Sequence, residues 1–222
     1  MTETYWIGGA VTLFTPAAEA LPRTVNITLQ NSGVRPEQVE SALWLGPLAL
    51  AQPAGLHWPV TAPLDHAVLQ NACRTLITGE WHLLLAGESA PQAAAAALLA
   101  SPSAVGRLNL VPRARLTPLP TLPPAPDWPQ ALWTAAQKTG EEDEPLEIEW
   151  LACAGPADER AAELQTALPA AQWLTPQPDS PLGIVLALNS LVHTLEQENA
   201  RAGLLLSLTT GQPLLATLLE RI

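Results

Sequence analysis

An internal repeat limits the possible folds of this sequence more than any other feature. Residues 26–47 and 133–156 share one plan: a helical stretch ends at a glycine, an acidic turn with a proline follows, and a short apolar strand closes on Gly-Pro. Residues 82–100 and 203–221 also match, because each predicts two strands joined by a tight turn. Helices that alternate with buried strands predict a layered α/β architecture. We therefore expect two duplicated α/β halves, with their helix layers stacked between two sheets.

The segment between the halves, residues 111–129, contains seven prolines. Proline fixes φ and removes a hydrogen-bond donor, so this segment is predicted to be an extended connector rather than a folded element. A ligand for a proline-recognising groove is the alternative. The predicted organisation is an N-terminal half over 1–110, a proline-rich connector over 111–129 and a C-terminal half over 130–222.

Composition excludes several classes of partner. The formal charge is −11, and the ten Lys and Arg residues are scattered singly, which argues against binding to nucleic acid or to an anionic membrane. The first residues include Glu3 and no basic region, so they do not resemble a signal peptide. No apolar run reaches the roughly 18 residues that span a bilayer. We expect a cytoplasmic protein, and the 14% content of charged residues suits a globule partly covered by another subunit.

The two cysteines, Cys73 and Cys153, lie in segments rich in Ala and Leu and form no CxxC pair. Two buried thiols in a reducing compartment are the first interpretation, and a structural disulfide stays open. The acidic run at 141–144 is interpreted as a solvated turn, because nothing beside it suggests a metal site. No cofactor is predicted.

Four segments carry a resemblance to a known family. They are WIGGAVTLFTP at 6–16, NSGVRPEQVESALWLG at 31–46, ITGEWHLLLAGES at 77–89 and LSLTTGQPLLATLLERI at 206–222. In their order and spacing they resemble the superfamily of β-ketoacyl synthases and thiolases, over nearly the whole chain apart from the connector. The resemblance implies a compact thiolase-like fold with layered sheets and central helices.

The chain departs from this family at the positions that carry its chemistry. Family enzymes use a cysteine at the start of a buried helix, where the helix N-terminus lowers the thiol pKa. The family's spacing from Gly79 places Ala62 there, and puts Cys73 eleven residues further on, inside the helix. The family's two histidine turns correspond to residues 152–156 and 175–183, which contain no histidine. The resemblance therefore implies a degenerate chain with no catalytic, cofactor-binding or metal-binding residues.

The histidines that are present offer little to replace this chemistry. By the same alignment His193 lies in mid-helix and His82 starts a strand, while His57 has no assigned role. Asp65 and His66 lie near the former nucleophile turn, but adjacent residues on a helix do not face each other. An acidic residue in the first turn of a surface helix is the ordinary interpretation of that pair.

Eight tryptophans accompany a single Phe and a single Tyr. Trp44 and Trp150 are equivalent in the repeat, so core packing is predicted for them, while at least one of the others is expected to anchor an interface. The others are Trp6, Trp58, Trp81, Trp128, Trp133 and Trp173.

Three functions compete. The first is a non-catalytic accessory or adaptor protein that acts through protein–protein contacts, because small inactive chains resembling this one act as helpers in the assembly or loading of secretion-system toxins. The second is an auxiliary subunit of fatty-acid or polyketide synthesis, similar to chain-length factors. The third is a small enzyme of unrecognised chemistry that uses Asp65, His66 or Cys153.

The resemblance also implies how the chain meets a partner. Thiolase-fold proteins dimerise through a strand near the nucleophile turn, which falls here around Trp58–Ala62. We expect a homodimer or a heteromer, although Pro59 and Pro63 could blunt that edge.

Overall fold

The computed structural model describes residues 3–12, 17–39, 42–45, 60–61, 69–70, 73, 81–88, 93–123, 127–139, 146–155, 159–177, 180–207 and 213–222. Its strands are β1 (Thr4–Thr12), β2 (Ala42–Leu45), β3 (Val60–Thr61), β4 (Trp81–Glu88), β5 (Ala93–Ala100), β6 (Ala114–Pro118), β7 (Trp150–Ala154), β8 (Gln172–Trp173), β9 (Ala202–Ser207) and β10 (Leu215–Arg221). Its helices are α1 (Ala17–Ser32), the 3₁₀ turn η1 (Pro36–Gln38), α3 (Pro102–Leu108), α4 (Trp128–Gln137), α5 (Glu159–Ala167) and α6 (Pro181–Gln197).

The strand order repeats itself across the centre of the sheet. The ten strands run β3-β2-β4-β5-β1-β6-β10-β9-β7-β8, so the sequence of partners in the first five is mirrored in the last five. In each half, three strands are parallel and the two nearest the centre pair antiparallel. At the centre, Thr4–Trp6 of β1 pairs antiparallel with Ala114–Leu116 of β6. The predicted duplication of an α/β unit is confirmed.

The prediction of an extended connector over residues 111–129 is wrong for its first part, which includes strand β6. Residues 114–118 form β6, which pairs with both β1 and β10 and joins the two halves into one continuous sheet instead of two separate ones. Ala114 and Leu116 are buried while Arg115 is half-buried, which is the alternation of a strand. The surrounding prolines hide this short pattern in the sequence. The second repeat therefore starts at β6, before the predicted boundary at 130, and α4 also begins inside the predicted connector, at Trp128.

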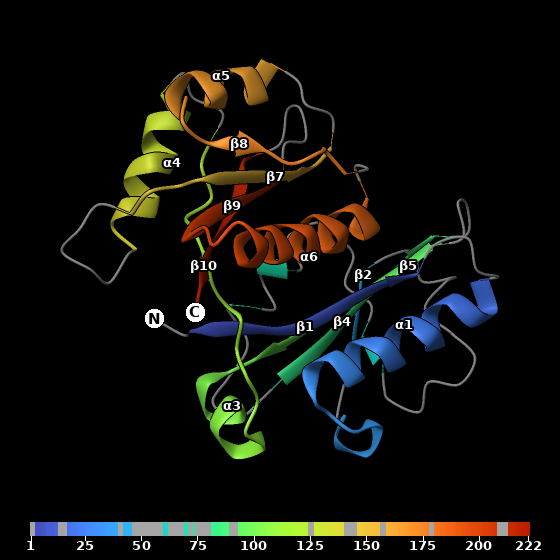
Figure 1. Ribbon diagram of the computed structural model, residues 1–222. Helices are drawn as coiled ribbons and strands as arrows, with labels where there is room; N and C mark the ends of the chain where they lie inside the picture. The colour runs from blue at the N-terminus through green and yellow to red at the C-terminus, as the bar shows by residue number, and fades with distance from the viewer. Residues whose placement is uncertain are drawn as a thin grey trace.

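Three hydrophobic cores hold the layers of helices and strands together, and α6 lies within the central one (Figure 1). An outer core lies between α1 and the N-terminal half of the sheet, and a second outer core lies between the C-terminal half and helices α4 and α5. The central core is shared, because it joins residues of both halves around α6, which lies between them. The predicted layering with central helices is confirmed.

Two successive glycines in β1 let helices approach the strand from opposite sides. A Cβ atom at Gly8 would lie 2.3 Å from the Ser32 hydroxyl oxygen and 3.1 Å from the Ser32 backbone nitrogen, on α1. A Cβ atom at Gly9 would lie 2.4 Å from the side-chain oxygen of Asn189, on α6. A side chain at Gly8 would push against α1, and one at Gly9 would displace the Asn189 side chain, so both glycines allow the close packing of these layers.

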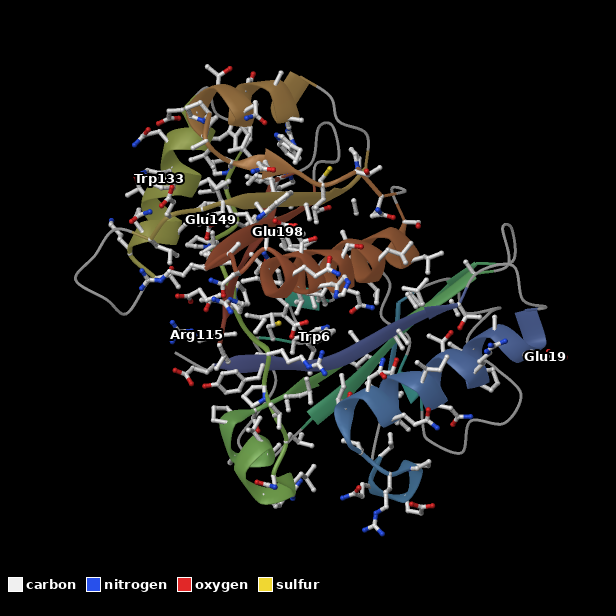
Figure 2. The ribbon with its side chains drawn as sticks, viewed as in Figure 1. Trp6, Glu19, Arg115, Trp133, Glu149 and Glu198 are labelled. Carbon is white, nitrogen blue, oxygen red and sulfur yellow. The ribbon has the colours of Figure 1, made fainter. Side chains whose placement is uncertain are left out.

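Asn189 connects the two halves by hydrogen bonds. Its side-chain oxygen accepts from the Trp6 indole N–H at 3.0 Å, and its amide N–H donates to the Ala96 carbonyl at 3.0 Å. Trp6 and Ala96 belong to the N-terminal half, whereas α6 belongs to the C-terminal half (Figure 2). Asn189 is a polar residue among the apolar residues of this helix, and this pattern could have indicated a buried hydrogen-bonding role. The sequence analysis did not predict one.

Candidate functional site

In open α/β sheets, ligands bind beyond the carboxyl ends of the parallel strands, so a site is expected at the ends of β7 and β9. At the end of β9, beside the first turns of α6, the structure has a small pocket. It is contributed by both halves, since the helical residues Leu69 and Gln70 meet α6, β9 and β10 there. Its lining residues are Leu69, Gln70, Ile184, Leu205, Leu206, Ser207, Leu215 and Thr217.

The described part of the pocket is small. Its cavity volume is about 20 Å³, which is roughly enough for one water molecule. Ligand sites usually enclose about 300–1,000 Å³.

The chemistry of the pocket is neutral. Its polar lining consists of the Gln70 amide and the hydroxyl groups of Ser207 and Thr217. Gln70 is 3% exposed, and its Nε2 donates to the Ala216 carbonyl at 2.7 Å, so it ties the N-terminal half to β10. None of these lining residues is an acid, a base or a thiol. The arrangement can hold water and fix the two halves together.

Cys73 lies one turn after Leu69 and Gln70, and all three described residues are helical. The residue is 1% exposed in the central core, and its carbonyl accepts a hydrogen bond from the Thr4 hydroxyl at 3.1 Å. The thiol is therefore inside a helix and not at its start, which is the position predicted for a core residue.

Cys153 is buried on the opposite face of the sheet from Cys73. On β7, Ala152 and Ala154 contribute to the central core, whereas Cys153 contributes to the outer core below α4 and α5. Strand alternation therefore directs its thiol away from the pocket. Its Sγ lies 3.8 Å from the Gly155 carbonyl oxygen. Neither cysteine forms a disulfide, so the bridge that the sequence left open is excluded.

The two segments that correspond to the family's histidine turns meet at the end of β7. Ala154 pairs with Gln177 in an isolated parallel bridge, and Gly155 adopts a φ of 110°. Ser180 then caps α6, because its hydroxyl accepts from the Gly183 N–H at 3.2 Å. One donor at the start of this helix is therefore already bonded to its own N-cap residue.

The other candidates do not converge on the pocket in the described residues. His193 is exposed in the middle of α6, and His82 is the second residue of β4, as predicted from the alignment. Ala62, His57, His66 and Asp65 lie outside the described residues. Across the described ranges, no group of three or more His, Cys, Asp and Glu side chains could hold a metal ion.

The tryptophans divide by burial. Trp6 and Trp128 are each 6% exposed, and the Trp128 indole N–H donates to Glu163 at 2.6 Å. Trp150 is only partly buried against the central core, so the core position predicted for it is incomplete. Trp133 and Trp173 are partly buried against the outer core of the C-terminal half. These three half-buried rings are the described tryptophans that could contact a partner.

The two ends of the sheet are equivalent in the repeat. β3, which lies within the predicted contact strand Trp58–Ala62, pairs with β2, and β8 pairs with β7. Each is a two-residue terminal strand whose outer side faces no further strand of the described sheet. In the part of the chain that the structure describes, no helix combines the length and hydropathy required to cross a bilayer.

Comparison with known proteins then places the fold. No family model matches the sequence, and no curated protein does. Human mitochondrial 3-ketoacyl-CoA thiolase in complex with CoA superposes with a TM-score of 0.71 at 11% identity, over 100% of this chain and 98% of that one. The fold is thiolase-like.

Two further solved structures with this fold come from bacteria. An oxazolomycin ketosynthase domain of Streptomyces albus superposes with a TM-score of 0.71 at 10% identity, over 99% of this chain and 95% of that chain. Acetyl-CoA acetyltransferase from Syntrophomonas wolfei gives a TM-score of 0.68 at 11% identity, over 99% of both chains. These TM-scores show that the fold is thiolase-like. The sequence identities are too low to carry over an activity, which has to be argued from the site.

Proposed function

We propose that this thiolase-fold chain is a non-catalytic accessory protein that acts through protein–protein contacts. One observation supports the proposal: the described residues at the end of β9 line a pocket with room for about one water molecule, and their polar side chains are one amide and two hydroxyl groups. Acyl transfer by a cysteine needs an accessible thiolate and a nearby acid–base group. Both described thiols are instead 1% exposed, one inside a helix and one on the opposite face of the sheet.

The body of the protein then serves as a platform. The terminal strand β3 offers backbone groups for pairing with another chain, and the half-buried Trp133, Trp150 and Trp173 offer aromatic contact area. In this proposal the partner is a secretion-system toxin or its apparatus, and the chain helps the toxin to assemble or load. The protein works in the cytoplasm.

Similarity to a ketosynthase domain favours a second candidate. In that case the chain is an auxiliary subunit that pairs with an active β-ketoacyl synthase, as chain-length factors do. Purification of the tagged chain from its native cell, followed by mass spectrometry, separates the two. A co-purifying toxin or secretion component supports the first function, whereas an active synthase or acyl carrier protein supports the second.

Alkylation tests the absence of catalysis. Both thiols of the native protein are expected to react with iodoacetamide far more slowly than free cysteine, because burial excludes the reagent. Mass spectrometry after timed quenching gives the rate at each residue, and protein unfolded in guanidinium is the control in which both react. A native thiol that reacts faster than free cysteine would revive the enzyme hypothesis and contradict the proposed function.

A further inference from the structure

The edge of the sheet at β8 extends beyond the two residues of that strand. The backbone N–H groups of Gln172 and Leu174 donate to the carbonyls of residues 149 and 151, each at 2.8 Å. The N–H of Gln177 donates to the carbonyl of residue 153 at 3.0 Å. The segment 172–177 therefore follows β7 along its length and forms the terminal edge of the described sheet.

The residues between these contacts face away from β7. In a parallel ladder, alternate residues of a strand bond to the same neighbour, so the N–H and C=O of Trp173 and the N–H of Thr175 point outward. Trp173 is half-buried and Thr175 is exposed, and no further strand of the described sheet lies on this side. These three backbone groups can therefore pair with an added strand.

Side-chain amides occupy the edge on both sides of these groups. The Nε2 of Gln165, on α5, donates to the Ala171 carbonyl at 3.1 Å, and the Nε2 of Gln177 donates to the Thr175 carbonyl at 3.1 Å. The open part of the edge is thus short and centred on Trp173. It suits a short extended peptide rather than a long strand.

Most of the formal charge of the chain lies next to this edge in the fold. Residues 127–163, which contain α4 and α5, hold ten of the 21 acidic residues against two of the ten basic ones, a net charge of −8 out of −11. Asp127, Glu147 and Glu163 are the exposed acidic residues of this segment whose side chains are described. Both helices cover the outer core on which the Trp173 ring packs, and β8 lies beside α5 (Figure 1). The edge therefore lies against an acidic layer.

We propose that the β8 edge binds a short, extended segment of the partner protein that is rich in Arg or Lys. This inference rests on the accessory function proposed above and adds the chemistry of the partner. The segment pairs its backbone with Trp173 and Thr175, and its cationic side chains lie over the acidic layer. An Arg guanidinium group stacks on the half-buried Trp173 ring.

Charge distinguishes the two ends of the sheet. The equivalent edge strand β3 belongs to residues 1–110, which hold seven acidic residues against four basic ones and so carry only −3. A cationic segment is attracted more strongly to the end that carries −8. β3 stays accessible for a different contact, because the two edges lie at opposite ends of the strand order.

Fluorescence anisotropy of labelled octapeptides with the full chain tests this site. A peptide of alternating Arg and Val is expected to bind, and its binding should weaken as NaCl is raised from about 50 to about 500 mM, because salt screens the attraction. The same peptide with every backbone nitrogen methylated keeps its charge but has no N–H for the Trp173 carbonyl, so it should bind at least about fivefold more weakly. A peptide with Glu in place of Arg should not bind.

A proline substitution tests the edge from the side of the protein. Thr175→Pro removes one outward N–H and leaves the bonds of Gln172 and Leu174 to β7 in place. It is expected to weaken binding of the Arg–Val peptide about fivefold, while circular dichroism and thermal unfolding stay as in the wild type. Thr175→Ala is the matched control, because it keeps the N–H and should bind the peptide as the wild type does.

Several outcomes would overturn the proposal. One is an Arg–Val peptide that does not bind the wild-type chain. Another is an unchanged affinity for either the N-methylated peptide or the natively folded Thr175→Pro variant, which would leave only unspecific attraction of charges. Equal binding of the Glu–Val peptide would also contradict it. Because alkylation and co-purification are measured separately, failure at the β8 edge is distinguishable from failure of the proposed accessory function.

Discussion

Leu188→Ala is expected to lower the free energy of unfolding by about 2–5 kcal/mol. Leu188 is 0% exposed on α6 and belongs to the core that both halves share. Truncation removes apolar contacts and leaves a cavity between the two halves of the sheet, which cannot both move inward to fill it. Urea unfolding followed by circular dichroism and by tryptophan fluorescence measures the loss.

Both signals should also change in a single, coincident transition, because the central core couples the halves. Ser190→Ala, exposed on the same helix, is the matched control and should change stability by less than about 0.5 kcal/mol. Two separate transitions in the variant would show that the halves are stable independently, which contradicts a shared core.

Gly8→Val is expected to destabilise the protein by about 1–3 kcal/mol or more through overpacking. The new Cβ would meet not only the flexible Ser32 hydroxyl but also the α1 backbone, at 3.1 Å from the Ser32 nitrogen and 3.3 Å from the Asn31 carbonyl carbon. Relief requires a shift of the whole helix away from β1. Thermal and urea unfolding measure the effect.

Gly106→Ala provides the contrasting control. Gly106 lies inside α3, and a Cβ there meets nothing within 4 Å. Alanine is a better helix former, so this variant should gain up to about 1 kcal/mol. A Gly8→Val variant as stable as the wild type would mean that α1 does not pack as closely on β1 as described.

Sequence patterns predicted those elements whose signal is local. The helix expected over 182–197 is α6 (Pro181–Gln197), and the strand pairs expected within 82–100 and 203–221 are β4–β5 and β9–β10. The helix shows a long helical spacing of apolar residues, and each strand pair has a clear turn sequence between its strands. β6 was missed because its five residues alternate only briefly and prolines flank them, so its assignment needs partners that are distant in sequence.

The candidate site was predictable only in part. The resemblance assigned the family's two histidine turns to residues 152–156 and 175–183, and the structure brings Ala154 and Gln177 of these segments together at the end of β7. The pocket itself could not be predicted, because the Gln70 amide meets the Ala216 carbonyl 146 positions away. Such a contact depends on how the halves dock, and no local pattern encodes it.

The central position of β6 has a consequence for synthesis. Along residues 4–6, β1 has β5 on one side and needs β6 on the other, yet that strand follows more than a hundred positions later. A nascent chain that stops near residue 110 therefore leaves one edge of β1 without its partner strand. It also exposes the apolar residues that the N-terminal half contributes to the central core. Such a fragment should associate with itself rather than fold, so productive folding waits until the second repeat begins to emerge.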